Sequence, residues 1–180
     1  MTTAIPLILL GVLTRLIPHP PNAVAMGALA LFAGARLPRR WAWIVPLLAM
    51  ALSDLVLDRG SLVAFGTVTR WTSYATFALI VGLGRFGRAA RPVALGALAV
   101  GGSTLFYLTT NFAVWATGTM YPHTTGGLLA CYVAAWPFYR NAMAADLAGT
   151  VALFGLDALA RRGLDAWAAR RRARLAGGAG

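Results

Sequence analysis

The sequence contains neither lysine nor glutamate, so its charge comes from 16 arginines and five aspartates, with a formal net charge of +11. An excess of positive charge occurs in proteins that bind nucleic acid, in proteins that lie on anionic lipid, and in the cytoplasmic loops of membrane proteins. The total does not decide among these classes. The positions of the arginines along the chain must do so.

Cysteine and histidine are almost absent as well. The single cysteine, Cys131, excludes an intrachain disulfide and a zinc site built from several thiolates. His19 and His123 could together ligate a metal ion, but two histidines in separate loops are more often ordinary polar loop residues. We therefore expect no metal and no cofactor. No Ser-His-Asp or paired-carboxylate spacing indicates hydrolysis, so we expect a protein that is not an enzyme.

Apolar residues are abundant: 59% of the chain is hydrophobic and its mean hydropathy is +0.69. Soluble domains contain about 45–50% apolar residues, and one bilayer-spanning helix needs about 20 of them. We predict one all-α membrane domain over residues 1–162, followed by a basic amphipathic tail at residues 163–180. Met1–Leu13 has no positive charge before its apolar part, so we expect a retained first span rather than a cleaved signal.

Arginine clusters divide the apolar sequence. Three clusters, within residues 36–40, 85–91 and 161–174, hold 12 of the 16 arginines. The positive-inside rule places all three in the cytoplasm, which requires an even number of membrane crossings between successive clusters. The seven apolar segments are Thr3–Ile17, Asn22–Arg36, Trp41–Leu57, Arg70–Arg85, Pro92–Ala116, Gly127–Phe138 and Met143–Leu159.

Three of these segments lie between the second and third clusters, so one of them must not cross. Gly127–Phe138 is the best candidate, because it is flanked by Gly126, contains Pro137 and is too short for a core of about 30 Å. We predict a re-entrant or interfacial half-helix there. Thr3–Ile17 and Asn22–Arg36 form a hairpin. The expected bundle has six transmembrane helices, with both termini in the cytoplasm, in the inner membrane of a bacterium.

The second segment is rich in small residues, which let helices approach closely. Such a face suits either packing within the bundle or contact with a partner helix. As a partner-binding face, its residues would be Ala23, Gly27, Ala30 and Gly34.

Polar side chains from four stretches gather at the outward side of this topology. Charged residues at or below a membrane interface are costly, so they indicate a functional site or a required ion pair. The charges could simply neutralise one another, and the aromatic residues could form the belt that is common at membrane interfaces. Interpreted as a site, the substrate-binding residues are Arg15, His19, Asn22, Asp54, Asn111, Trp115, Tyr121, Arg140, Asn141 and Asp146.

Two other patterns bear on partners. Residues 82–87 match G-x-G-x-x-G, but they follow an apolar helix and no acidic residue lies between Asp58 and Asp146, so we reject a dinucleotide site. Leu164–Leu175 places its apolar residues near one face and arginines on the rest, as in a helix that lies on anionic lipid. Nucleic acid could use the same charges, but no base-reading module is present, so we expect no nucleic-acid binding.

Several stretches resemble an uncharacterised family of small bacterial membrane proteins. They are RLIPHPPN at residues 15–22, LFAGA at 31–35, and residues 46–54, 110–115, 121–122 and 131–141. That family is described as similar to the S components, the substrate-binding subunits of energy-coupling-factor vitamin transporters. The resemblance implies a six-helix protein that binds a vitamin or metal ion near the extracellular side. It also implies a membrane scaffold subunit and paired ATPases as partners, with small residues of the first helices contacting the scaffold.

Three functions follow from these patterns. The first is a substrate-binding transporter subunit that captures a vitamin-like micronutrient from the periplasmic side, with cobalamin or a precursor as one candidate. The second is a structural or assembly protein whose charges lock the bundle. The third is a membrane enzyme that acts on a lipid through Asp54, Asp58 or Asp146. We favour the first.

Overall fold

The computed structural model describes residues 4–177, and their side chains as far as Arg172. This part of the chain is helical and contains no strand. The helices are α1 (Ala4–Leu16), α2 (Met26–Arg36), α3 (Arg39–Leu57), α4 (Val68–Gly84), α5 (Pro92–Thr117) and α6 (Thr125–Gly177), with short 3-10 helices η1 (Val63–Gly66) and η2 (Arg85–Arg88). The prediction of an all-α protein is confirmed.

Three of the described helices, α3, α5 and α6, are long and apolar enough to cross a membrane. This is fewer than the six full spans expected from the sequence. With a rise of about 1.5 Å per residue, α1 is about 20 Å long and α2 about 16 Å, well short of a hydrocarbon core of about 30 Å. The described part of the chain is therefore a helical protein of membrane type in which α1 and α2 are much shorter than a full span and α4, with 17 residues, is also slightly short of one.

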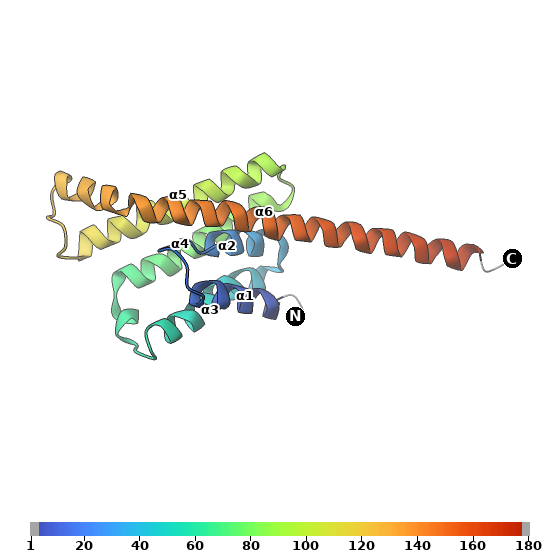
Figure 1. The fold of residues 1–180 in the computed structure, drawn as a ribbon, viewed down its shortest axis with the longest axis horizontal. Helices are drawn as coiled ribbons and strands as arrows, with labels where there is room; N and C mark the ends of the chain where they lie inside the picture. Colours follow the sequence, from blue (N-terminus) through green and yellow to red (C-terminus); the bar gives the residue numbers. More distant parts are fainter. Residues whose placement is uncertain (1–3, 178–180) are drawn as a thin grey trace.

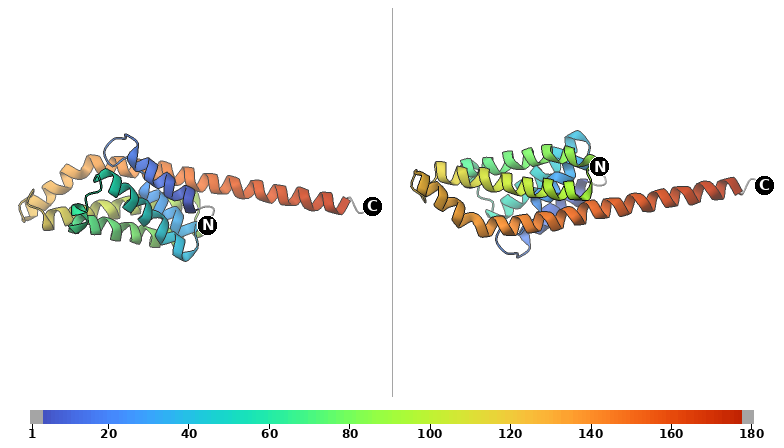
Figure 2. Two further views of the ribbon diagram at one scale, coloured as in Figure 1. Left: turned by 90° about the horizontal axis from the view of Figure 1, so that it is seen from below. Right: turned by 90° about the horizontal axis from the view of Figure 1, so that it is seen from above.

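The helices alternate in direction along one axis, and α1 and α2 form a short hairpin whose turn lies part-way along the bundle (Figures 1 and 2). As a result, the ends that carry the three arginine clusters lie at the same end of the bundle. Arg36 links them: its Nε donates to Asp157 on α6 at 2.7 Å, and its NH1 donates to the carbonyl of Arg88 at 2.9 Å. The parity argument from the arginines thus agrees with the arrangement of the helices.

The predicted half-helix is wrong. Gly127–Phe138 does not end in the bilayer but forms the first turns of α6, which continues without a break through Met143–Leu159. Pro137 lies inside this helix, and α6 bends in this region (Figure 2), because proline lacks the N–H of one helical hydrogen bond and its ring clashes with the preceding turn. Because the two segments are one helix, two long helices, α5 and α6, lie between the second and third arginine clusters.

The short helix α2 is the centre of the bundle, with Met26 through Ala35 all buried. It crosses α4 backbone to backbone: a Cβ added to Gly34 would lie 2.0 Å from the carbonyl oxygen of Val81. Ala30 is fully buried, and Gly27 faces Asp146 of α6. Gly27, Ala30 and Gly34 of the predicted partner-binding face are therefore buried within the same chain, while Ala23 is half-buried in the loop before α2. A scaffold subunit could not reach the buried residues of this face without moving α4 or α6.

Many large apolar side chains point outward from the bundle, while its interior combines apolar side chains such as Val45, Ile80 and Val81 with several polar ones. The buried polar residues are Ser53, Asp54, Thr76, Ser103, Thr110, Asp146 and Thr150. Exposed apolar residues include Ile5, Leu9, Leu13, Leu48, Leu52, Leu79, Val133 and Val151. Such an extended apolar surface is typical of a helical membrane protein.

The basic tail is not a separate unit. The expected boundary between residues 162 and 163 falls inside α6, which continues straight past the end of the bundle (Figure 1). The 21 residues from Asp157 to Gly177 would extend about 30 Å at the helical rise.

Candidate functional site

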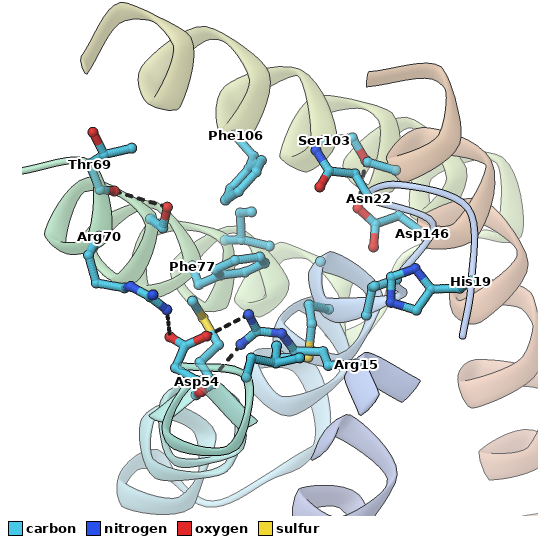
Figure 3. A pocket seen from close by; sticks show the side chains of 18 of the residues that line it. Arg15, His19, Asn22, Asp54, Thr69, Arg70, Phe77, Ser103, Phe106 and Asp146 are labelled. Carbon is cyan, nitrogen blue, oxygen red and sulfur yellow. Dashed lines mark hydrogen bonds and ion pairs between the residues drawn. The ribbon is translucent and has the colours of Figure 1, made fainter. Parts of the chain in front are cut away.

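A cavity of about 600 Å³ lies among the α1–α2 loop, α3, the start of α4, α5 and α6. Its size falls within the range of about 300–1,000 Å³ that is usual for small-molecule sites. It reaches the exposed loop residues His19 and Asn22 and the exposed Thr67, so it opens to the outside. Its polar lining residues are Arg15, His19, Asn22, Asp54, Thr67, Thr69, Arg70, Ser73, Ser103 and Asp146 (Figure 3).

Asp54 forms one pole of the cavity. This carboxylate, on α3, is 1% exposed and bridges two arginines: Arg15 of α1, at 2.6 Å, and Arg70 of α4. The hydroxyl of Tyr74 donates to its second oxygen at 2.9 Å. Arg15 also donates to Ser53 at 2.9 Å. Because one buried carboxylate joins three helices, it fixes their relative position at this end of the cavity.

Arg70, like Asp54, is fixed in position by several contacts. Its helix begins after Thr67, whose hydroxyl accepts from the backbone N–H of Arg70 and caps the helix. One guanidinium nitrogen contacts Asp54 and the other donates to Asp58 at 2.7 Å, while the ring of Phe65 lies 5.4 Å from the guanidinium carbon. With Arg15 and Asp54, this makes a group of two arginines and two aspartates whose charges cancel.

Asp146 forms the opposite pole. It lies on α6, is 5% exposed, and accepts hydrogen bonds from the hydroxyl of Ser103 at 2.7 Å and from the backbone N–H of Ala28 at 2.9 Å. Ala28 is in the first turn of α2, and the N-cap residue, Ala25, has no capping side chain. Asp146 therefore caps α2 from a distant part of the chain, satisfying a backbone donor that the helix itself cannot.

Glycine at position 27 permits this contact. A Cβ on Gly27 would lie 2.3 Å from a carboxylate oxygen of Asp146. Any side chain there would displace the carboxylate from the end of α2. The small-residue pattern of this segment thus serves both helix packing and the approach of a buried charge.

Two phenyl rings separate the poles. Phe77 of α4 and Phe106 of α5 have centroids 5.0 Å apart and are tilted by 41°. Figure 3 shows them between the Asp54 group and the Asp146 group. The cavity is therefore amphipathic, polar at its two ends and apolar between them, which suits a small molecule with a flat apolar body.

The structure brings together half of the predicted site. Arg15, His19, Asn22, Asp54 and Asp146 line the cavity. A second, smaller cavity of about 80 Å³ is lined by Asn111 and also by Asn22. Asn111 thus lies beside the site rather than in it.

Four predicted residues line neither cavity. Trp115 donates to the carbonyl of Pro122 at 2.9 Å and packs against His123, so it orders the α5–α6 loop, where Tyr121 also lies. Asn141 donates to the carbonyl of Pro21 at 3.0 Å and holds the α1–α2 loop against α6. Arg140 is exposed.

Helix geometry explains why Arg140 and Trp115 do not line the cavity. Ala142 and Asp146 line the cavity four residues apart, on one face of α6. Arg140 is six residues from Asp146, which is a rotation of about 240° at 100° per residue and places it on another face. Trp115 is nine residues beyond Phe106, about 13 Å further along α5.

Arg70, Ser103, Phe77 and Phe106 were not predicted to belong to the site. Arg70 had a signal in the sequence: it is one of the four arginines outside the three clusters, as is Arg15, and an isolated arginine at the edge of an apolar segment indicates an internal partner. Ser103 and the two phenylalanines had none, because serine and phenylalanine are ordinary residues of a packed helix.

Residues 1–167 match the model of a family of unknown function, DUF6580. The chain belongs to this family. No curated protein and no solved structure matches the chain. The match covers the whole bundle and ends at Trp167, so the last arginine-rich turns of α6 lie outside it. The family description assigns no activity, and the function must be argued from the cavity.

Proposed function

We propose that this protein is a substrate-binding membrane subunit that takes a vitamin-sized molecule into the cavity between the Asp54 and Asp146 poles. The observation that carries the proposal is the cavity itself: about 600 Å³, charged at both ends and apolar in the middle, inside a bundle whose outer surface is apolar. The resemblance to S components of energy-coupling-factor transporters leads to the same function. In that case a membrane scaffold subunit and ATPases would supply the energy for uptake.

The cavity favours binding over a purely structural role. If the buried charges served only to lock the bundle, each would pair directly and leave no space of about 300 Å³ or more. The Asp54 group does pair in this way, but Asp146 forms no ion pair within residues 4–172, and the space between the poles is about 600 Å³.

The same contacts disfavour an enzyme that acts on a lipid. Metal-dependent chemistry on a diphosphate needs carboxylates with free oxygens close together. Arg70 bridges Asp54 and Asp58 and neutralises them, while Asp146 lies at the far end of the cavity.

The arginines support an orientation for this function. With the three clusters on the cytoplasmic side of a bacterial inner membrane, both termini are cytoplasmic and the mouth of the cavity faces the periplasm. The extension of α6 beyond the bundle then meets anionic lipid or stands free in the cytoplasm. Because α2 is buried, a scaffold subunit would use an outer apolar face such as that of Ile5, Leu9 and Leu13 on α1.

A pair of tryptophan substitutions on α4 tests the proposal. Thr69 lines the cavity and Thr72, one turn further along, does not. Thr69→Trp should fill the mouth without removing a charge, so the protein should lose the small molecule that co-purifies with it. Thr72→Trp should retain that molecule.

Native mass spectrometry of protein purified gently from its own membranes measures the bound mass in the wild type and both variants. A wild-type protein with no bound molecule, or a Thr69→Trp variant that retains it fully, would contradict the binding function.

A further inference from the structure

The two carboxylates that line the cavity differ in their partners. Asp54 is paired with Arg15 and Arg70, and with Asp58 the group is neutral. Asp146 accepts from a hydroxyl and a backbone N–H, and none of the ion pairs formed within residues 4–172 involves it. The wall of the cavity therefore holds one negative charge that no side chain of the described bundle neutralises.

The N-terminus of α2 offsets this charge only in part. A helix terminus contributes roughly half a positive elementary charge. Asp146 is also nine-tenths buried or more, so water in the cavity reaches only a small part of the carboxylate. A buried carboxylate without a cationic partner is costly, and a cation placed in the adjacent cavity would remove that cost.

An anionic molecule finds no arginine without a carboxylate partner in the lining of this cavity. The backbone donor at the start of α2 is already occupied by Asp146. The terminal guanidinium nitrogens of Arg15 and Arg70 are already engaged by Asp54, Asp58 and Ser53. An anion would have to displace a buried carboxylate from its arginines.

The groups around Asp146 suit a cation with a flat apolar body. His19 and Asn22 belong to the α1–α2 loop and lie beside Asp146 of α6 (Figure 3). Their side chains can accept hydrogen bonds from a nitrogen cation. Asn141 holds this loop in place through Pro21. The faces of Phe77 and Phe106 line the route between the poles, and aromatic faces attract cations.

We propose that the substrate is an organic monocation, a flat molecule bearing an amidinium or a similar nitrogen cation, and that Asp146 in the α2–α5–α6 corner of the cavity binds the cationic group. This inference rests on the proposed binding function and specifies the substrate class of the same site. Asp146 acts as the recognition residue, while the Asp54 group forms the neutral far wall.

Three probes of equal shape test the charge preference: naphthalene-2-carboxamidinium, naphthalene-2-carboxamide and naphthalene-2-carboxylate. Their dissociation constants are measured by calorimetry on the purified full-length protein in detergent. The cation should bind at least about tenfold more tightly than the amide, the ratio expected for a hydrogen bond to a charged group, and the carboxylate should bind most weakly.

Asp146→Asn should remove the preference, so that the cation and the amide bind with similar affinity. The asparagine oxygen can still accept from the N–H of Ala28, so α2 keeps its cap, and the amide nitrogen can donate to the hydroxyl oxygen of Ser103, which then donates to the carbonyl of Ala99. Asp165→Asn, the same change at an exposed position of α6, should keep the preference. If Asp146→Asn fails to fold, the ratio among the three probes on the wild-type protein still decides.

Equal binding of the cation and the amide, or tighter binding of the carboxylate, would overturn the inference while the binding function stands. A preference that persists in Asp146→Asn would also overturn it. If none of the probes binds at millimolar concentration and no molecule co-purifies, both the binding function and this inference fail.

Discussion

Asp54 and Asp146 are the two buried carboxylates among the described side chains, and they are stabilised in different ways. Asp54 relies on two guanidinium groups from other helices, so the three side chains depend on one another. Asp146 relies on neutral donors and on the end of a helix. Removing a charge from the Asp54 group therefore leaves an unpaired charge behind, whereas the carboxylate of Asp146 remains available to pair with a cationic ligand.

Removing the charge of Asp54 should destabilise the protein strongly. Asp54→Asn leaves two arginines beside a buried amide, and breaking a buried ion pair costs about 3–5 kcal/mol. Equilibrium unfolding in mild detergent measures the loss. Asp165→Asn should change the free energy of unfolding by less than about 0.5 kcal/mol, because residue 165 is exposed. Equal stability of the two variants would show that the Asp54 group does not hold the bundle together.

At the scale of elements, glycine decides how closely helices meet. Gly34 and Gly84 lie at the crossing of α2 and α4, where an added Cβ at either position would approach a carbonyl oxygen of the other helix to 2.0 or 2.3 Å. Gly149 of α6 has a similar role against Ala25 and Ala28. These contacts place the start of α2 beside Asp146, so the packing of a central helix also builds the cavity.

Gly34→Ala should force α2 and α4 apart, because the alanine Cβ has no space against Val81. We expect a loss of about 1–3 kcal/mol, typical of overpacking, and weaker ligand retention as the cavity wall moves. Gly82→Ala is the matched control on α4, since nothing lies within 4 Å of the added Cβ. It should be neutral or stabilising by up to about 1 kcal/mol through higher helix propensity. Unfolding in detergent compares the two, and similar losses would contradict the role of Gly34.

For the whole molecule, the distribution of charge and of apolar residues should set the orientation. Reporter fusions at Arg88 and after Arg162 should report the cytoplasm, and fusions in the loops near Gly60 and Gly118 should report the periplasm. The loops near Gly60 and Gly118 lie at the opposite end of the bundle from the arginine clusters (Figures 1 and 2). A periplasmic signal at Arg88 would invert the orientation and turn the mouth of the cavity toward the cytoplasm.

The sequence alone determined the class of the protein and much of its layout. Hydropathy and arginine positions are local properties, so they identified a helical membrane protein, most of its helical segments and the shared end of the three clusters without knowledge of packing. Arg15, Asp54 and Asp146, three of the five predicted site residues that line the cavity, do so for a related reason, because a charged residue in an apolar segment tends to face inward; His19 and Asn22 lie in the α1–α2 loop at its mouth.

Tertiary structure decided the features that depend on the rotation of each helix about its axis and on where the helices cross. Arg70 joins Asp54, while Arg140 turns away from Asp146 on the same helix. Gly127–Phe138 and Met143–Leu159 form one helix, α6, because the backbone tolerates Pro137 with a bend. The length and proline content of the segment do not reveal this tolerance. The small residues of α2 pack against helices of the same chain, which depends on the contacts of the whole bundle rather than on any one segment.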